Sequence, residues 1–235
     1  MLNSKADGDV VKSPNDETSR NVLLPIKSET DVVIGYPKAA SRGCDIYFSA
    51  DVETDGPIPG PYSMLSFALV YAGAYDGKTF FRPPVYDKTF YVELQPISLN
   101  FEKEALAVNG LDRNQLIENG TEPVAAMTEA ASWVREQAGI GSPVIVAYPL
   151  SFDWSWLYWY FVQYSQTGSP FGYSRGFDIK TALAVKLGRM VSNSGRSRIP
   201  EAVKSKLVHT HHALDDALEQ AEIFANVFTM NGGYD

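Results

Sequence analysis

Apolar and polar residues alternate over residues 46–53, which predicts a β-strand that begins at Asp45. The segments 64–72 and 89–94 are rich in Leu, Phe, Val and Tyr, as strands usually are, and they are expected to form the next two strands. A short continuous apolar run over residues 144–147 is typical of a strand that is buried on both faces. The first part of the ordered chain is therefore predicted to be mainly β-structure.

Helical spacing of apolar residues dominates the later part of the chain. A short strand is expected at 177–179, and Ser151 is expected to cap the helix that contains Asp153. Strands come first and helices alternate with strands later, so the predicted fold class is α/β with a mixed sheet. The helices are predicted at residues 100–108, 123–137, 153–164, 181–187 and 212–229.

Residues 1–42 are rich in Ser, Asp, Asn and Lys and show no sustained periodicity. We expect them to form a flexible N-terminal tail, followed by one domain over residues 43–235. Two apolar islands, 22–26 and 32–34, interrupt the polar tail. These islands are predicted to dock on the domain or on a partner.

Composition agrees with a single globular domain, because the 235 residues are 45% hydrophobic and 20% charged. A single cysteine, Cys44, excludes an intramolecular disulfide and suits a reducing compartment. No apolar stretch approaches the 18 residues of a membrane span, and the N-terminus lacks the basic start and apolar run of a signal peptide. A cytoplasmic location is expected.

The net charge of −8 hides an uneven distribution of charged residues. Residues 175–206 hold eight Lys or Arg residues, including Arg196 and Arg198, against two acidic residues. This segment is either a solvated loop and helix face or a strip that contacts the phosphates of a nucleic acid.

Three acidic segments carry candidate chemistry. On a strand, Asp51 and Glu53 point to the same side, where they form either a solvent-facing polar edge or ligands for a hard metal ion. Asp153 follows a buried strand and could simply stabilise a helix N-terminus. The segment 211–217 starts an amphipathic helix. Taken alone, it would hold a capping or surface histidine, His211, and a carboxylate at Asp215 or Asp216 that interacts with the helix dipole.

Taken together, the segments favour a metal site. Oxygen ligands alone suit Mg²⁺ or Mn²⁺ better than Zn²⁺ or Cu²⁺. A pair of such ions can stabilise both the attacking and the leaving oxygen of a phosphoryl displacement, and a nearby histidine can accept the proton of the attacking water. Four carboxylates, from one strand and two helices, would form the site: Asp51, Glu53, Asp153 and Asp216.

In their order and spacing the motifs resemble the DEDDh branch of the DnaQ-like exonuclease superfamily, which includes RNase T and oligoribonuclease. The residues that carry the resemblance are Asp51-Val52-Glu53-Thr54, Phe152-Asp153 and His211-His212-Ala213-Leu214-Asp215-Asp216-Ala217. The likeness spans residues 45–230, and it implies a ribonuclease H-like fold with a five-stranded mixed sheet flanked by helices. One position departs from the family pattern, because Pro149 stands where an asparagine is frequent.

The resemblance also implies roles for individual residues. Asp51, Glu53, Asp153 and Asp216 would hold two Mg²⁺ or Mn²⁺ ions, and His211, five positions before Asp216, would be the general base. His209, His212 and Asp215 would then be bystanders. Thr54 would lie near the terminal nucleotide of the substrate, and Arg196 and Arg198 are expected to bind substrate phosphates.

The implied activity is metal-dependent 3′–5′ exonuclease hydrolysis, which releases nucleoside 5′-monophosphates from single-stranded DNA or RNA. Relatives that act on DNA and on RNA share the same motifs, so both substrates stay open. Two alternatives also stay open: a non-catalytic nucleic-acid-binding module, and a subunit whose N-terminal tail recruits a polymerase or another partner. Several relatives form homodimers, which makes a homodimer possible here.

Overall fold

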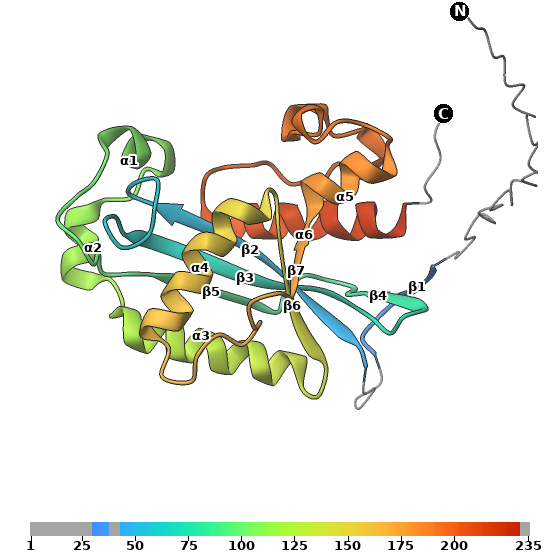
Figure 1. Ribbon diagram of the computed structural model, residues 1–235, viewed down its shortest axis with the longest axis horizontal. Coiled ribbons are helices and arrows are strands. Elements are labelled where there is room, and N and C mark those ends of the chain that lie inside the picture. Colours follow the sequence, from blue (N-terminus) through green and yellow to red (C-terminus); the bar gives the residue numbers. More distant parts are fainter. Residues whose placement is uncertain (1–29, 38–42, 231–235) are drawn as a thin grey trace, which may run out of the picture.

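The computed structural model describes residues 30–37 and 43–230, which form one α/β unit (Figure 1). Its strands are β1 (Asp31–Ile34), β2 (Asp45–Thr54), β3 (Met64–Tyr75), β4 (Thr79–Arg82), β5 (Thr89–Glu93), β6 (Ser142–Ala147) and β7 (Gly176–Asp178). Its α-helices are α1 (Lys103–Asn109), α2 (Arg113–Asn119), α3 (Pro123–Ala138), α4 (Leu150–Tyr164), α5 (Ile179–Lys186) and α6 (Ala213–Thr229). Three short 3₁₀ turns lie between α5 and α6, at Val191–Asn193, Arg196–Arg198 and Glu201–Val203.

The strands form one mixed sheet in the order β1-β4-β3-β2-β6-β7, and β5 pairs with β3 beyond the stretch that β4 covers. β2 lies between antiparallel β3 and parallel β6. All five predicted strands are present, but the sheet has seven strands because β1 and β4 extend it. The mixed α/β class is confirmed.

The additional strand β1 lies within the segment that was predicted to be a tail. Residues Asp31–Ile34 pair in parallel with β4, which gives the apolar island 32–34 a place on the edge of the sheet. The island 22–26 lies outside the described residues. Of the two predicted docking places, the island 32–34 uses the domain itself, and the division into a tail and a domain stays a prediction.

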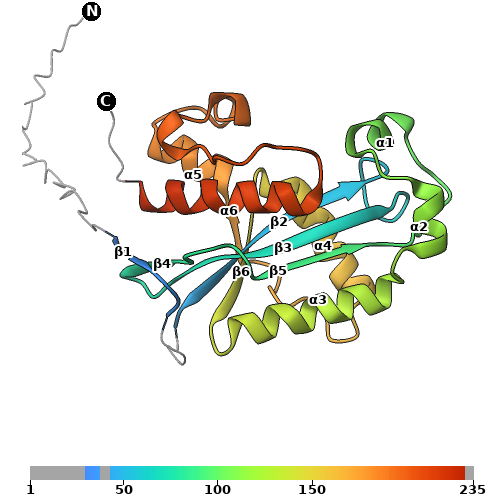
Figure 2. The same ribbon diagram turned by 180° about the vertical axis from the view of Figure 1, so that it is seen from behind.

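Helices cover both faces of the sheet (Figures 1 and 2). Alternate residues of β2 point to opposite faces: Phe48 belongs to the core that α3 and α4 cover, whereas Tyr47 packs with α5 and α6. Burial on both faces explains why β2 and β3 contain so few exposed positions. Consequently, polar side chains on β2 are held inside the molecule.

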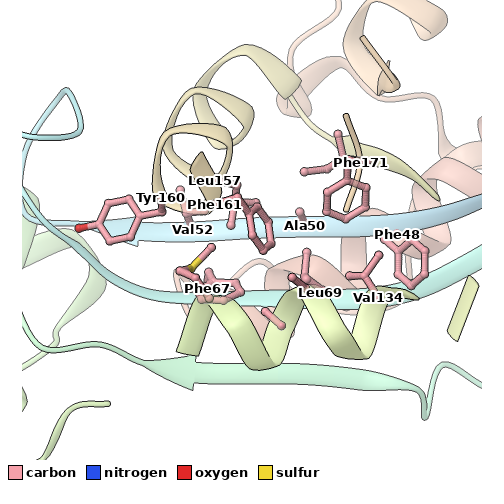
Figure 3. Close-up of a cluster of buried hydrophobic side chains, with 14 of the residues drawn as sticks. Phe48, Ala50, Val52, Phe67, Leu69, Val134, Leu157, Tyr160, Phe161 and Phe171 are labelled. Atoms are coloured by element: carbon pink, nitrogen blue, oxygen red, sulfur yellow. The ribbon is translucent and has the colours of Figure 1, made fainter. Parts of the chain in front are cut away.

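The core below α4 is aromatic (Figure 3). Phe48, Phe67 and Phe171 belong to one buried cluster with the inner side of α4, where Phe171 contacts Phe161 edge to face. The hydroxyl of Tyr160 accepts a 2.7 Å hydrogen bond from the backbone N–H of Met64. Close packing of this kind holds α4 rigidly against β2 and β3. This matters for function because α4 carries Asp153.

Local departures from the predicted elements have simple causes. Helix α2 was missed, although Asp112 caps it by accepting bonds from the N–H groups of Asn114 and Gln115. The prediction that Ser151 caps α4 is wrong, because α4 begins at Leu150, whose N–H donates to Asp178.

None of the helices in the described part of the chain has the length and hydrophobicity needed to span a lipid bilayer.

Candidate functional site

Two carboxylates lie at the end of β2, on the face of the sheet that α6 covers. The side chains of Asp51 and Glu53 are both buried, with 8% and 9% of their surface exposed. A solvent-facing polar edge is therefore the wrong interpretation of this alternating pattern. Buried carboxylates require partners or cations, so this pair is a candidate for chemistry.

Asp153 joins the pair from α4. Strand β6 pairs with β2 as far as Ser49 and then ends, which leaves the N–H of Val52 without a strand partner on that side. The Oδ1 atom of Asp153 accepts a hydrogen bond from this N–H at 3.1 Å. The bond fixes the Asp153 carboxylate beside the backbone between Asp51 and Glu53.

Asp216 completes the group from the first turn of α6. Its Oδ1 accepts a 2.8 Å hydrogen bond from the N–H of Thr210, and its Oδ2 accepts a 3.0 Å bond from the N–H of His211. Carboxylate oxygens of Asp51, Glu53 and Asp216 all lie within 4.8 Å of one another. The structure thus brings together all four predicted carboxylates from three separate elements.

Sequence reasoning missed Gln220, which lies one turn after Asp216 on the same side of α6. Its side chain is fully buried, and its Nε2 donates a 2.7 Å hydrogen bond to Oδ1 of Asp51. A glutamine four residues after a candidate ligand, within an apolar helix stripe, was a signal that could have identified it. Gln220 orients Asp51 without adding charge.

The cluster concentrates negative charge in a buried place. Burial is the largest cause of the raised pKa of Asp51, and the neighbouring carboxylates raise it further, while Arg196 opposes them. Burial, with the charges of Asp216 and Asp153, raises the pKa of Glu53 to about 8. Burial also raises the pKa of Asp153 to about 7, against the opposing effect of its backbone hydrogen bonds.

These features fit divalent cations of the hard type. The donors are carboxylate oxygens, and their mutual repulsion is relieved when a cation lies between them. Asp51, Glu53 and Asp216 offer oxygens within 4.8 Å of one another, and Asp153 is hydrogen-bonded to the same stretch of β2. The residues present therefore fit Mg²⁺ or Mn²⁺.

Three histidines lie beside the carboxylates. The Nδ1 atom of His209 is 2.8 Å from Oδ2 of Asp216, and burial lowers the pKa of this imidazole. His211 is exposed, has a φ of 59°, and its ring centroid lies 4.5 Å from that of His209. His212 instead packs against Tyr91 with a centroid distance of 4.9 Å.

The carboxylates and His211 open into one cleft of about 660 Å³. Thr54, which donates to the carbonyl of Gly56 at 2.9 Å, lines this cleft as predicted for a residue close to substrate. The walls include Val108 of α1 and Phe152 of α4, which remain 56% and 40% exposed. An apolar rim above a charged floor suits a ligand with a flat ring and a phosphate.

The two predicted substrate arginines differ in position. Arg196 lines the cleft, forms an ion pair with Glu219 of α6, and lies over the Tyr148 ring at 5.3 Å. Arg198 is exposed, donates to Asn193, and is not among the residues that line the cleft. Of the two, Arg196 is the cation that faces the carboxylate cluster.

Pro149, which stands where the family frequently has an asparagine, lines the same cleft as Arg196. The Tyr148–Pro149 peptide bond is cis, and both residues line the cleft. The Tyr148 hydroxyl donates a 2.6 Å hydrogen bond to the carbonyl of Ser194. Tyr148 thus ties the segment before α4 to the segment that carries Arg196.

No family model matches the chain, but two curated nucleases are similar to it in sequence. The chain is 36% identical over 181 residues to the 3′–5′ DNA exonuclease Cap18 of Escherichia coli, which covers 77% of this chain and 90% of that protein. It is 26% identical over 181 residues to ribonuclease T of Shewanella denitrificans, covering 75% of this chain and 77% of the relative.

A solved structure supports the fold independently of sequence. The nuclease domain of 3′hExo, a DEDDh family member bound to rAMP, superposes with a TM-score of 0.58 at 12% identity. The match covers 80% of this chain and 93% of that domain. At this identity the likeness concerns the fold, which is the ribonuclease H-like arrangement expected from the motifs.

Proposed function

The chain belongs to the DEDDh family of 3′–5′ exonucleases, and we propose that it removes nucleoside 5′-monophosphates from the 3′ end of single-stranded DNA. The observation that carries the proposal is the convergence of Asp51, Glu53, Asp153 and Asp216 on one cleft. The similarity to a protein named as a DNA exonuclease favours DNA over RNA.

We assign the four carboxylates to two Mg²⁺ or Mn²⁺ ions. When bound, the ions would stabilise the charge that develops on the attacking and leaving oxygens. Gln220 keeps the Asp51 carboxylate in one orientation, and Val52 does the same for Asp153. Fixed orientation matters because the ligands need no rearrangement when substrate arrives.

We assign the role of general base to His211. Its ring lies at the mouth of the cleft, and its backbone N–H is held by Asp216 at 3.0 Å. An imidazole nitrogen of His211 would accept the proton of the water that attacks phosphorus. The P–O3′ bond then breaks, the shortened strand keeps a 3′-hydroxyl, and the terminal nucleotide leaves as its 5′-monophosphate.

The cleft provides contacts for the end of a strand. Val108 and Phe152 present apolar surface to the terminal nucleoside, and Thr54, which follows Glu53 at the end of β2, lines the same cleft. Arg196 supplies positive charge to a phosphate next to the broken bond. Arg198, which does not line the cleft, would contact a more distant phosphate, and its role stays a prediction.

A comparison of matched oligonucleotides tests the function. The full chain is incubated with Mg²⁺ or Mn²⁺ and 5′-labelled DNA or RNA of the same sequence, single-stranded or in a duplex. The proposal predicts a ladder that shortens from the 3′ end, fastest for single-stranded DNA. Faster degradation of RNA would contradict the substrate assignment, and no degradation of any strand would contradict the function.

A non-catalytic binding module is the weaker alternative, because the carboxylate set is complete and the relatives are named as nucleases. Homodimer formation, a partner recruited by the N-terminal residues, and a cytoplasmic location stay predictions. Size-exclusion chromatography with light scattering tests the first of these directly.

A further inference from the structure

Two histidines stand beside the carboxylate cluster, and one of them, His209, lies outside the family motifs. Ring nitrogens of His209 and His211 and a carboxylate oxygen of Asp216 all lie within 4.8 Å of one another. The Nδ1 atom of His209 is buried and makes no hydrogen bond, although it lies 2.8 Å from Oδ2 of Asp216. The same nitrogen lies 3.5 Å from Oε2 of Glu219. A buried nitrogen that is this close to carboxylate oxygens without a hydrogen bond is suited to share a cation with them.

The chemistry of this group differs from that of its neighbour. Asp51, Glu53 and Asp216 offer oxygens alone, which suit Mg²⁺ or Mn²⁺, whereas two imidazoles and one carboxylate suit Zn²⁺. Asp216 belongs to both groups. A Zn²⁺ ion held by the histidines would therefore compete with the ions of the carboxylate cluster for one ligand.

We propose that His209, His211 and Asp216 form a Zn²⁺ site, and that Zn²⁺ bound there inhibits the exonuclease. Three protein ligands leave one position for water in a tetrahedral site. The ion would bind the imidazole of His211, which is proposed as the general base, so that this ring could no longer accept a proton. It would also draw Asp216 away from Asp51 and Glu53. The inhibitory part rests on the proposed function, whereas the binding part does not.

The binding part is tested without any turnover. The full chain is stripped of transition metals, kept in saturating Mg²⁺, and titrated with Zn²⁺ against a chromophoric chelator. A second titration uses Co²⁺ as a probe whose visible absorption reports the ligand geometry. His209→Ala should weaken Zn²⁺ binding by at least about 100-fold, since loss of a ligand costs more than loss of a supporting contact. His211→Ala, an exposed position, should do the same.

His212→Ala is the matched control, because His212 lies next in the chain but packs on Tyr91 and pairs with Asp215. It should bind Zn²⁺ as tightly as the wild type and give the same Co²⁺ spectrum. Equal Zn²⁺ affinity of His209→Ala, His211→Ala and wild type would overturn the site, whatever the activity of the protein.

Inhibition is then measured for each protein as the fraction of its own Mg²⁺-dependent activity that remains as Zn²⁺ is added. Wild type and His212→Ala should lose activity at the Zn²⁺ concentration at which the binding titration saturates. His209→Ala should need at least about 100-fold more Zn²⁺, in proportion to its loss of affinity. Full Zn²⁺ occupancy without loss of activity would overturn the inhibitory role and leave the binding site standing.

Discussion

The site has two parts that are built in different ways. Asp51 and Glu53 project from the buried strand β2, and Asp153 projects from the buried face of α4. Hydrogen bonds from Gln220 and Val52 hold Asp51 and Asp153. The histidines at 209 and 211 lie on the loop before α6, where His211 is exposed and has a positive φ. The first part is fixed by packing, and the second is fixed mainly by Asp216.

The difference in rigidity matches the two proposed functions, ion binding by the carboxylates and proton acceptance by His211. Charged groups that bind ions gain from rigidity, because the cost of bringing them together has already been met during folding. A proton acceptor has to meet water and substrate, which an exposed loop allows. His211 adopts a left-handed backbone conformation that costs a non-glycine residue of order 1–3 kcal/mol, and its bond to Asp216 offsets this cost.

The most damaging change to the buried part is Asp51→Asn. The amide keeps the shape of the side chain but removes one negative charge from the proposed ion site. We expect turnover of 5′-labelled single-stranded DNA to fall by at least about 10³. A gel-based rate measurement checks this prediction. Activity within a few-fold of wild type would contradict the proposed role of Asp51 as an ion ligand.

The most damaging change to the loop part is His211→Ala. Loss of a general base is expected to lower kcat by about 10²–10⁴. His212→Ala is the control, since it removes an adjacent imidazole that packs on Tyr91. Equal losses for the two variants would mean that the loop matters only for its structure.

Arg196→Ala tests whether the cleft needs positive charge next to the carboxylates. We expect weaker substrate binding and a salt dependence whose slope is smaller by about 1, because one phosphate contact is lost. Arg198→Ala is the comparison, because Arg198 does not line the cleft. A similar change in its slope would support the predicted contact with a more distant phosphate, and an unchanged slope would contradict that contact. The measurement is KM at several salt concentrations.

The smallest effect concerns the stability of the metal-free protein. Folding raises the pKa of Glu53 to about 8 and that of Asp153 to about 7, so the protonated carboxyls stabilise the folded state at low pH. This stability is lost as the pH rises through those values. The Tm should therefore fall by a few degrees between about pH 5 and about pH 8 and recover when Mn²⁺ is added.

Asp51→Asn sharpens the stability measurement, because it removes one charge from the repelling group. The variant should show a weaker fall of Tm with pH and a smaller recovery with Mn²⁺, although it is the least active protein in the series. Stability gained at the cost of activity is common at sites that concentrate like charges. A pH profile identical to that of wild type would show that the carboxylates do not repel one another.

Much of the central sheet and of the carboxylate set follows from sequence pattern. The alternation over β2 and the apolar run of β6 give those strands directly, because burial imposes those patterns. β1 and β4 are strands of four residues each, and β1 lies at the edge of the sheet, where, among the described strands, it pairs only with β4. Such a pairing depends on the neighbouring strand, which the local sequence of β1 does not reveal. α2 was missed because its seven residues contain little apolar periodicity.

The contacts that orient the site were harder to predict. Gln220 and Asp51 are 169 positions apart, and their hydrogen bond depends on how α6 crosses the sheet. His209 was interpreted as a bystander from its spacing, yet the turn before α6 brings its Nδ1 to 2.8 Å from Asp216. Spacing within a motif identifies residue types, whereas long-range packing decides which atoms meet.

Binding of Mn²⁺ to the metal-free chain, followed by electron paramagnetic resonance, tests the central claim most directly. Asp153 is the decisive residue, since it lies about 100 positions from Asp51 and reaches the cluster only through the fold. The account predicts two bound ions in wild type and a clear loss of Mn²⁺ affinity in Asp153→Asn, equal to that in Asp51→Asn. Wild-type affinity and stoichiometry in Asp153→Asn would contradict the claim that these carboxylates form one site.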